Sequence, residues 1–155
     1  MNKRINKIKK VRQFLIEQVA NLTHSQLNNI PQGYNNNIIW NLVHLISIQQ
    51  ALCYFKAAQK AIVPDRYITP FSINTKPVSI VGEEEIIGIK SLFISTIDAL
   101  QKDYEKEIFY NYAASPNIFK VYGIEVTSID DALEFLLYHE GYHTGYILCL
   151  KKTLN

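Results

Sequence analysis

The amino-acid sequence predicts an all-α protein, folded as a four-helix bundle in a single domain over residues 1–155. Four segments of about fifteen to twenty-five residues repeat apolar side chains every three or four positions, the spacing of an amphipathic helix. Two long connections separate some of these segments, so simple hairpin wiring throughout is not expected. The chain also has the length and the apolar fraction, 48%, of an ordinary globular domain that buries a substantial core.

The first predicted helix covers about residues 2–22. Its apolar stripe consists of Ile5, Ile8, Val11, Leu15, Val19 and Leu22. Six of the first twelve residues are Lys or Arg, but the apolar stripe between them favours a solvated helix face over a targeting peptide or a nucleic-acid arm. The net charge of only +2 likewise predicts neither a nucleic-acid nor a membrane partner. His24 follows this helix in a polar loop and is expected at the surface.

The second predicted helix begins after Asn35, Asn36 or Asn37, each a suitable N-cap, and continues to about Lys60. Three prolines mark the next connection as non-helical: Pro64, Pro70 and Pro77. The third helix is predicted to begin near Gly82, because three glutamates follow it and negative charge suits the first turn of a helix.

The segment between Tyr104 and Thr127 has a mixed pattern. Its apolar residues predict either a short strand or a packed loop, and they are Phe119, Val121, Ile124 and Val126. The last helix has the clearest start, because Ser128 and Asp131 have the spacing of a capping box. Its apolar and aromatic stripe also carries two of the four histidines of the chain.

Three histidines form the candidate metal site. His139 and His143 are four residues apart, so on a helix they project from one face with Cβ atoms roughly 6 Å apart, as two ligands of one ion do. His44 lies on the apolar side of the second helix, where a bundle neighbour brings it against that face. A hydrogen-bonded core histidine is the alternative for His44 alone. Three inward-facing histidines together favour a divalent metal site.

Residues 139–143 also fit the H-E-x-x-H pattern of zinc peptidases, in which the glutamate is the general base. Those enzymes take a third ligand from further along the chain. The residues after His143 contain no His, Asp or Glu. The peptidase interpretation is therefore a minor alternative, and His44 is the expected third ligand.

Two segments resemble motifs of the DinB/YfiT-like superfamily. Residues 37–45 place Trp40 four positions before His44, as in the second helix of that family. Residues 136–147 contain H-x-x-x-H followed by a glycine and an aliphatic residue, as in its last helix. The sequence departs from the common His-Arg-Gly-Gln ending, because Thr144 and Tyr146 stand where the family often has Arg and Gln.

This resemblance implies a four-helix bundle with a long crossover between helices 2 and 3, a homodimer, and a three-histidine site for zinc or nickel. Family members include S-transferases that use the low-molecular-weight thiols bacillithiol or mycothiol, a maleylpyruvate isomerase and metal-dependent hydrolases. The implied partner is a small-molecule substrate. The implied ligands of the metal ion are His44, His139 and His143.

An open three-histidine site predicts catalysis or ligand binding, because structural zinc sites are normally closed by four protein ligands. Glu140 is a candidate base or else a solvent-facing charge. Asn41, Tyr146 and Tyr142 are candidates for orienting a ligand or its bound water, and packing in the core is the alternative for both tyrosines. Tyr67 and Phe71 are candidates for the rim of a pocket. The competing hypothesis is a non-enzymatic helical module with a structural metal or none.

The two cysteines of the chain, Cys53 and Cys149, are far apart and lack the CxxC spacing. Two cysteines are too few for a disulfide scaffold, and a reduced compartment fits them best. The sequence therefore predicts a cytoplasmic protein.

Overall fold

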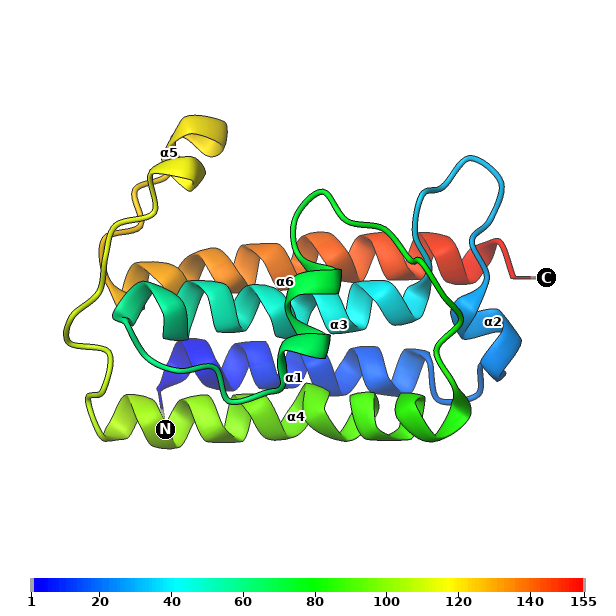
Figure 1. The fold of residues 1–155 in the computed structure, drawn as a ribbon, viewed down its shortest axis with the longest axis horizontal. Helices are drawn as coiled ribbons and strands as arrows, with labels where there is room; N and C mark the ends of the chain where they lie inside the picture. Colours follow the sequence, from blue (N-terminus) through cyan, green and yellow to red (C-terminus); the bar gives the residue numbers. More distant parts are fainter. Residues whose placement is uncertain (1, 155) are drawn as a thin grey trace.

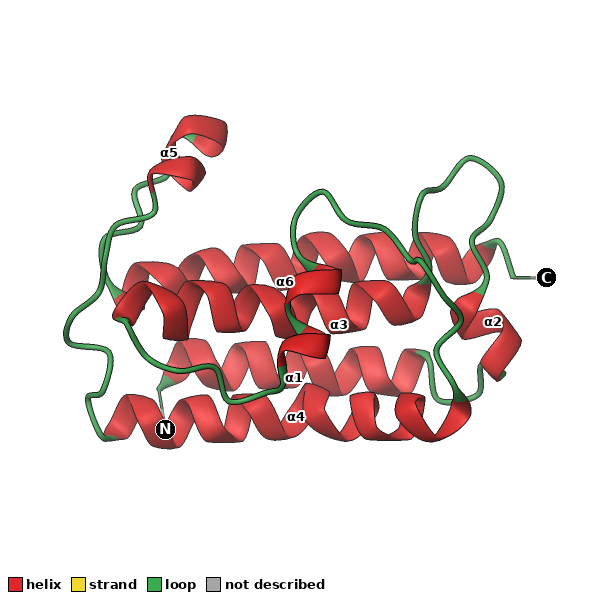
Figure 2. Cartoon of the chain, viewed as in Figure 1, coloured by secondary structure: helices red, strands yellow, loops and turns green. Residues whose placement is uncertain are grey.

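The computed structural model describes residues 2–154, and over this range the chain forms helices joined by loops with no strand (Figure 2). Four long helices lie side by side: α1 (Lys3–Gln18), α3 (Ile38–Gln49), α4 (Glu83–Glu105) and α6 (Ile129–Lys152) (Figure 1). Helices α1 and α3 each pack against both α4 and α6, so the four enclose one core. The predicted all-α class is confirmed.

The direction of the helices decides which ends meet. After α3 the chain passes back along the bundle over residues 58–82, so α3 and α4 run in the same direction while α3 and α6 are antiparallel (Figure 1). This connection contains only short 3₁₀ turns at Asp65–Tyr67 and Thr69–Phe71, as its prolines predict. The end of α3 and the start of α6 therefore lie at the same end of the bundle.

Helix α1 ends at Gln18, earlier than the predicted residue 22. A separate short helix, α2 (His24–Asn28), follows, because Thr23 and Gln26 form a reciprocal capping box that starts a new helix. The expectation of a free surface position for His24 is wrong. It is half-buried, and its Nε2 lies 2.7 Å from the carbonyl oxygen of Val81.

Helix α3 is the most completely buried of the four long helices. Asn37 is its N-cap and accepts a hydrogen bond from the backbone N–H of Trp40. Every residue of Ile38–Gln49 is buried. By length and composition Ile38–Ala57 would pass as a membrane span, but 89% of its apolar stretch is buried inside the bundle, as expected of a core helix.

The helical path changes after Gln49. Residues Gln50–Tyr54 form a π-helical turn and Phe55–Ala57 a 3₁₀ turn, and Ala58 ends the helix with a left-handed backbone conformation. The predicted end near Lys60 is therefore slightly late. A π-helical turn places an additional residue in one turn and is frequent at functional sites.

The predicted strand or packed loop before α6 is a short helix, α5 (Pro116–Tyr122), standing away from the bundle near the start of α6 (Figure 1). Proline at the first helical position suits a helix start, and Gly123 ends the helix with a φ of 69°. Phe119 and Val121 are exposed, whereas Val126 beyond the helix is buried. The alternating apolar residues of this segment therefore do not belong to a β-strand.

The capping box predicted for the last helix is confirmed. The Ser128 side chain accepts a hydrogen bond from the N–H of Asp131, and the Asp131 carboxylate accepts one from the N–H of Ser128. The carboxylate also accepts hydrogen bonds from Thr127, and together these bonds lower the pKa of Asp131. The start of α6 is thus well defined, which sets where its histidines lie.

A buried ion pair joins all four long helices. Arg12 of α1 and Glu140 of α6 are both inaccessible to solvent, and Nε and Nη2 of Arg12 donate to Oε1 of Glu140 at 2.8 and 2.7 Å. The Arg12 guanidinium also donates to acceptors on α3 and α4, which are Leu45 O, Gln49 Oε1, Phe93 O and Thr96 Oγ1. Each guanidinium nitrogen has at least as many acceptors as hydrogens, which compensates for burying the charge.

This ion pair corrects two expectations. Arg12 interrupts the apolar stripe of α1 in the sequence, yet it points into the core and its guanidinium lies 4.6 Å from the ring centre of Phe93. Glu140 is neither solvent-facing nor available as a base at the histidines, because its carboxylate is held by Arg12. Burial raises the pKa of Glu140, and the Arg12 guanidinium opposes that rise.

Removing one partner of this pair is expected to destabilise the protein strongly. Arg12→Met leaves the Glu140 carboxylate buried without a counter-ion, so the free energy of unfolding in urea should fall by about 3–5 kcal/mol. The double variant Arg12→Met/Glu140→Met should lose less than the sum of the two single variants, because neither charge is then left unpaired.

A matched control is Arg4→Met, on the same helix. Arg4 pairs with Asp130 and Glu134 at the surface, and exposed pairs contribute little to stability because water and salt screen them. If Arg12→Met costs no more than Arg4→Met, the buried ion pair does not have the central role assigned to it.

Candidate metal centre

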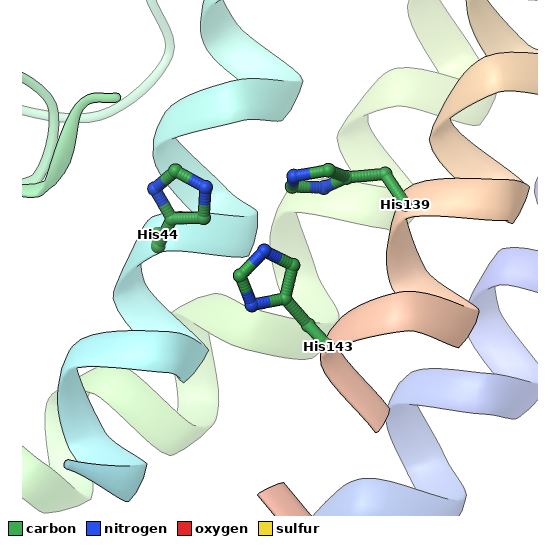
Figure 3. Close-up of side chains that lie close together, drawn as sticks. All are labelled: His44, His139 and His143. Carbon is green, nitrogen blue, oxygen red and sulfur yellow. The ribbon is translucent and has the colours of Figure 1, made fainter. Parts of the chain in front are cut away.

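The three histidines singled out in the sequence meet between α3 and α6. One ring nitrogen from each of His44, His139 and His143 lies within 4.8 Å of the other two, and the rings point to a common space (Figure 3). The ring centres are 4.5 to 5.3 Å apart. His139 and His143 project from successive turns of α6, and α3 supplies His44 from the facing side.

The ring of His44 is held on two sides. Its Nδ1 lies 2.6 Å from the carbonyl oxygen of Phe71, which can only accept a hydrogen bond, so Nδ1 carries the proton. Trp40, one turn earlier on α3, stacks on the ring with 4.7 Å between centres and an angle of 12° between planes. The orientation of His44 therefore comes from its own helix and from the connection after it.

The ring of His143 is held by Asn41. The side-chain oxygen of Asn41 lies 2.7 Å from Nδ1 of His143. The amide nitrogen of Asn41 donates to Asn36 Oδ1 and to Asn37 O, and these two bonds define which end of the amide is the oxygen. Nδ1 of His143 is therefore the donor. Asn41 is thus hydrogen-bonded to one of the three histidines.

These contacts determine the tautomers. Because Nδ1 is protonated in His44 and His143, each ring presents the lone pair of Nε2, the form in which histidine binds a metal. In His139 the buried Nδ1 has no hydrogen-bond partner among residues 2–154. A buried polar atom without a partner is costly, and it indicates a ligand at this place.

The surroundings keep all three imidazoles neutral. Burial and the neighbouring His143, His44 and Arg12 lower the pKa of His139 to about 2. Burial and His44 lower the pKa of His143 to about 3. Burial also lowers the pKa of His44, although its bond to Phe71 opposes this. A metal ion binds the deprotonated form of histidine, and low pKa values keep these imidazoles deprotonated at neutral pH. The residues present therefore fit a divalent metal ion.

A cavity of about 620 Å³ opens beside the histidines. It lies between α3, α5 and α6, and all three histidines line it. Tyr146 lines it as well, with its ring edge-on to Tyr34 at 5.7 Å between centres. Tyr142 also lines the cavity but is 60% exposed, so its alternative role in the core is wrong. The histidine cluster is thus accessible to a small molecule.

The two rim candidates from the proline-rich connection lie elsewhere. Tyr67 is buried in the hydrophobic core, and Phe71 contributes its carbonyl oxygen to His44 while its side chain packs against the core. The part of this connection that reaches the cavity is Ile73 and Asn74. Aromatic character alone did not identify the residues of the cavity rim, because both rings instead pack against the core and anchor the connection to the bundle.

Two contributions were absent from the sequence analysis. The first is the carbonyl of Phe71, because every residue has a backbone carbonyl and none is marked out by the sequence. The second is α5, whose Ile118, Val121 and Tyr122 line the cavity. The signal for α5 was Pro116 followed by Gly123, a typical start and end of a short helix.

A four-helix bundle whose inward histidines meet at an accessible cavity is compatible with metal binding in the bundle core. The sequence profile of the DinB superfamily matches residues 7–147, which is nearly the whole described chain. The chain therefore belongs to the DinB superfamily. No curated protein and no solved structure matches the sequence significantly.

The depressed histidine pKa values predict acid sensitivity of the metal-free protein. An unfolded histidine has a pKa of about 6.5, whereas the folded values for His139 and His143 are about 2 and about 3. Between the folded pKa values and pH 6.5, the unfolded chain binds more protons than the folded protein does. The stability is therefore complete above about pH 6.5 and falls as the pH is lowered towards 3.

Urea unfolding in the presence of a chelator, repeated between pH 7 and pH 4, measures this effect. His139→Phe removes one group that is protonated in the unfolded state, so the stability of this variant should fall less steeply with falling pH. The difference in slope between wild type and variant should be up to about 1.4 kcal/mol per pH unit. An identical pH dependence in wild type and His139→Phe would contradict the prediction.

Proposed function

We propose that this DinB-superfamily protein is an enzyme that binds one divalent metal ion, zinc or nickel, through His44, His139 and His143 and acts on a small molecule in the adjoining cavity. The observation that carries the proposal is the arrangement of the three imidazoles. Their ligand atoms lie within 4.8 Å of one another, and hydrogen bonds from Nδ1 direct two of them. Such support from neighbouring acceptors is typical of metal-binding histidines.

Three neutral ligands leave the full charge of the ion and at least one coordination position free for the substrate. When bound, the ion supplies a Lewis acid that lowers the pKa of a coordinated group. The residues of the chain supply the rest. Asn41 and the Phe71 carbonyl keep the rings oriented.

The lining favours a thiol over water as the activated group. Within residues 2–154, no Asp or Glu lines the cavity to take a proton from water, since Glu140 faces Arg12. A thiol ionises with a pKa of about 8.5 and so needs far less assistance than water, with a pKa of about 15.7. Thiolate is also a ligand that zinc binds readily. We therefore propose thiol-dependent S-transfer, with metal-dependent hydrolysis as the second candidate.

The metal site predicts one equivalent of zinc or nickel per chain in protein purified without a histidine tag. The single variants His44→Ala, His139→Ala and His143→Ala should each lose it, measured by elemental analysis after dialysis against zinc. Asn41→Leu should weaken zinc binding by about 10–100-fold, because it removes the acceptor that orients His143.

His24→Ala is the control, because His24 bonds to Val81 in the connection before α4 and has no place in the cluster. It should keep its metal. Wild-type protein that takes up neither zinc nor nickel would refute the site. Metal that is bound and needed for folding, without turnover in any assay, would support the structural alternative.

The two reactions can be separated with simple substrates. Zinc-loaded protein should accelerate the reaction of a neutral alkanethiol with 1-chloro-2,4-dinitrobenzene, in which sulfur bonds to the ring carbon, chloride leaves and the thiol proton passes to solvent. His143→Ala should abolish the acceleration. If instead only the hydrolysis of p-nitrophenyl acetate depends on His143, hydrolysis is the reaction.

A further inference from the structure

The walls of the cavity carry no formal charge. Of the residues described, those lining it are asparagines, aromatic and aliphatic side chains and the three histidines, with no Lys, Arg, Asp or Glu. This is unexpected in a chain with 16 basic and 14 acidic residues. The buried pair formed by Arg12 and Glu140 lies one helix face away and presents its charges to each other, not to the cavity.

Asparagines from the start of α3 make one end of the cavity polar. Asn36 and Asn41 lie beside His143, and Tyr146 follows it on α6. The other end, next to α5, is mainly apolar, and Asn117 of α5 is the asparagine that lines it. Four-residue steps lead from His44 to Ile48 on α3 and on to Leu52 in the π-helical turn after it. One four-residue step leads back from His139 to Phe135 on α6. Both series run towards the same end of the bundle.

Helix α5 covers this apolar end. Ile118, Val121 and Tyr122 line the cavity there, and the ring of Tyr122 lies 5.6 Å from that of Phe135 and 6.0 Å from that of Tyr138. The π-helical turn at Gln50–Tyr54 supplies Ala51 and Leu52 to the same wall. Leu52 follows His44 by eight residues, about two helical turns, so the groove extends away from the histidines along this wall.

We propose that the ligand of this cavity is an uncharged molecule with one metal-binding group, such as a thiol, and an apolar or aromatic body that lies along α3 and α6 and ends beneath α5. The position of the metal-binding group rests on the proposed function. The apolar body rests on the groove alone.

Charged ligands are disfavoured for a physical reason. A carboxylate or phosphate placed against the walls near α5, away from the histidines, gives up its hydration and finds no ion-pairing side chain in return. Aliphatic and aromatic groups, in contrast, gain from leaving water. Thiols or acceptors that carry several carboxylates or phosphates therefore fit this chain poorly, and neutral hydrophobic thiols fit it well.

The test uses three probes of equal length that differ at the end far from sulfur: heptane-1-thiol, 6-sulfanylhexanamide and 6-sulfanylhexanoate. The chain has a single tryptophan, Trp40, which lines the cavity and stacks on His44, so its fluorescence reports binding. Zinc-loaded protein is titrated under reducing conditions, and its zinc content is measured afterwards. Heptane-1-thiol should bind at least tenfold more tightly than 6-sulfanylhexanoate, with the neutral amide between them.

A charge introduced at the far end should alter this order. Val121 is 69% exposed, so Val121→Lys adds a cation at the α5 end without disturbing the core. It should tighten the binding of 6-sulfanylhexanoate at least threefold and leave the amide nearly unchanged. Ile87→Lys is the matched control, because Ile87 is 70% exposed on α4 and does not line the cavity. It should change no affinity by more than twofold.

The outcomes separate this inference from the proposed function. Zinc bound by the three histidines together with equal or tighter binding of 6-sulfanylhexanoate overturns the inference and leaves the metal site standing. No fluorescence response to any of the three thiols in zinc-loaded protein also overturns it. If zinc is not bound, the same titration with heptan-1-ol and hexanoate applies. Preference for the alcohol then supports the uncharged groove, and preference for hexanoate overturns it.

Discussion

The ion pair between Arg12 and Glu140 is the interaction on which the rest of the structure depends. Two opposite charges removed from water are tolerated only when every donor has an acceptor, and Arg12 finds its acceptors on α3, α4 and α6. Those acceptors can be reached only if all four helices keep one relative rotation. Since Glu140 lies between His139 and His143 along α6, the same constraint turns both histidines towards α3.

The ion pair also explains why an H-E-x-x-H sequence does not form a peptidase site here. Residues one apart on a helix point about 100° away from each other. The histidines occupy one face of α6 and the glutamate another, and Arg12 holds that glutamate in the core. The histidine face therefore has no carboxylate beside it. An open, neutral cavity with three imidazoles at one end is the result, and it suits a ligand that needs no strong base to lose its proton.

The support of the imidazoles comes from groups that lie outside the cluster. The Phe71 carbonyl belongs to the connection over residues 58–82, and Asn41 is held by the turn that precedes α3. The long connection thus has a chemical role as well as a topological one. It sets the tautomer of His44, while the residues at the start of α3 set that of His143. Both loops are anchored by buried side chains, which keeps these acceptors in place.

The sequence by itself determined the all-α class, the cap Ser128 and the three histidines, and it narrowed the cap of α3 to three neighbouring asparagines. Helical periodicity and capping depend on neighbours within a few residues. It did not determine the burial of Arg12 and Glu140, the Phe71 carbonyl contact or the covering of the cavity by α5. Each of these joins residues far apart in the chain, and a charged side chain, a backbone carbonyl or a short apolar segment looks the same in the sequence whether it meets solvent or a distant partner. Only the packing of α1, α3, α4 and α6 decided between those states.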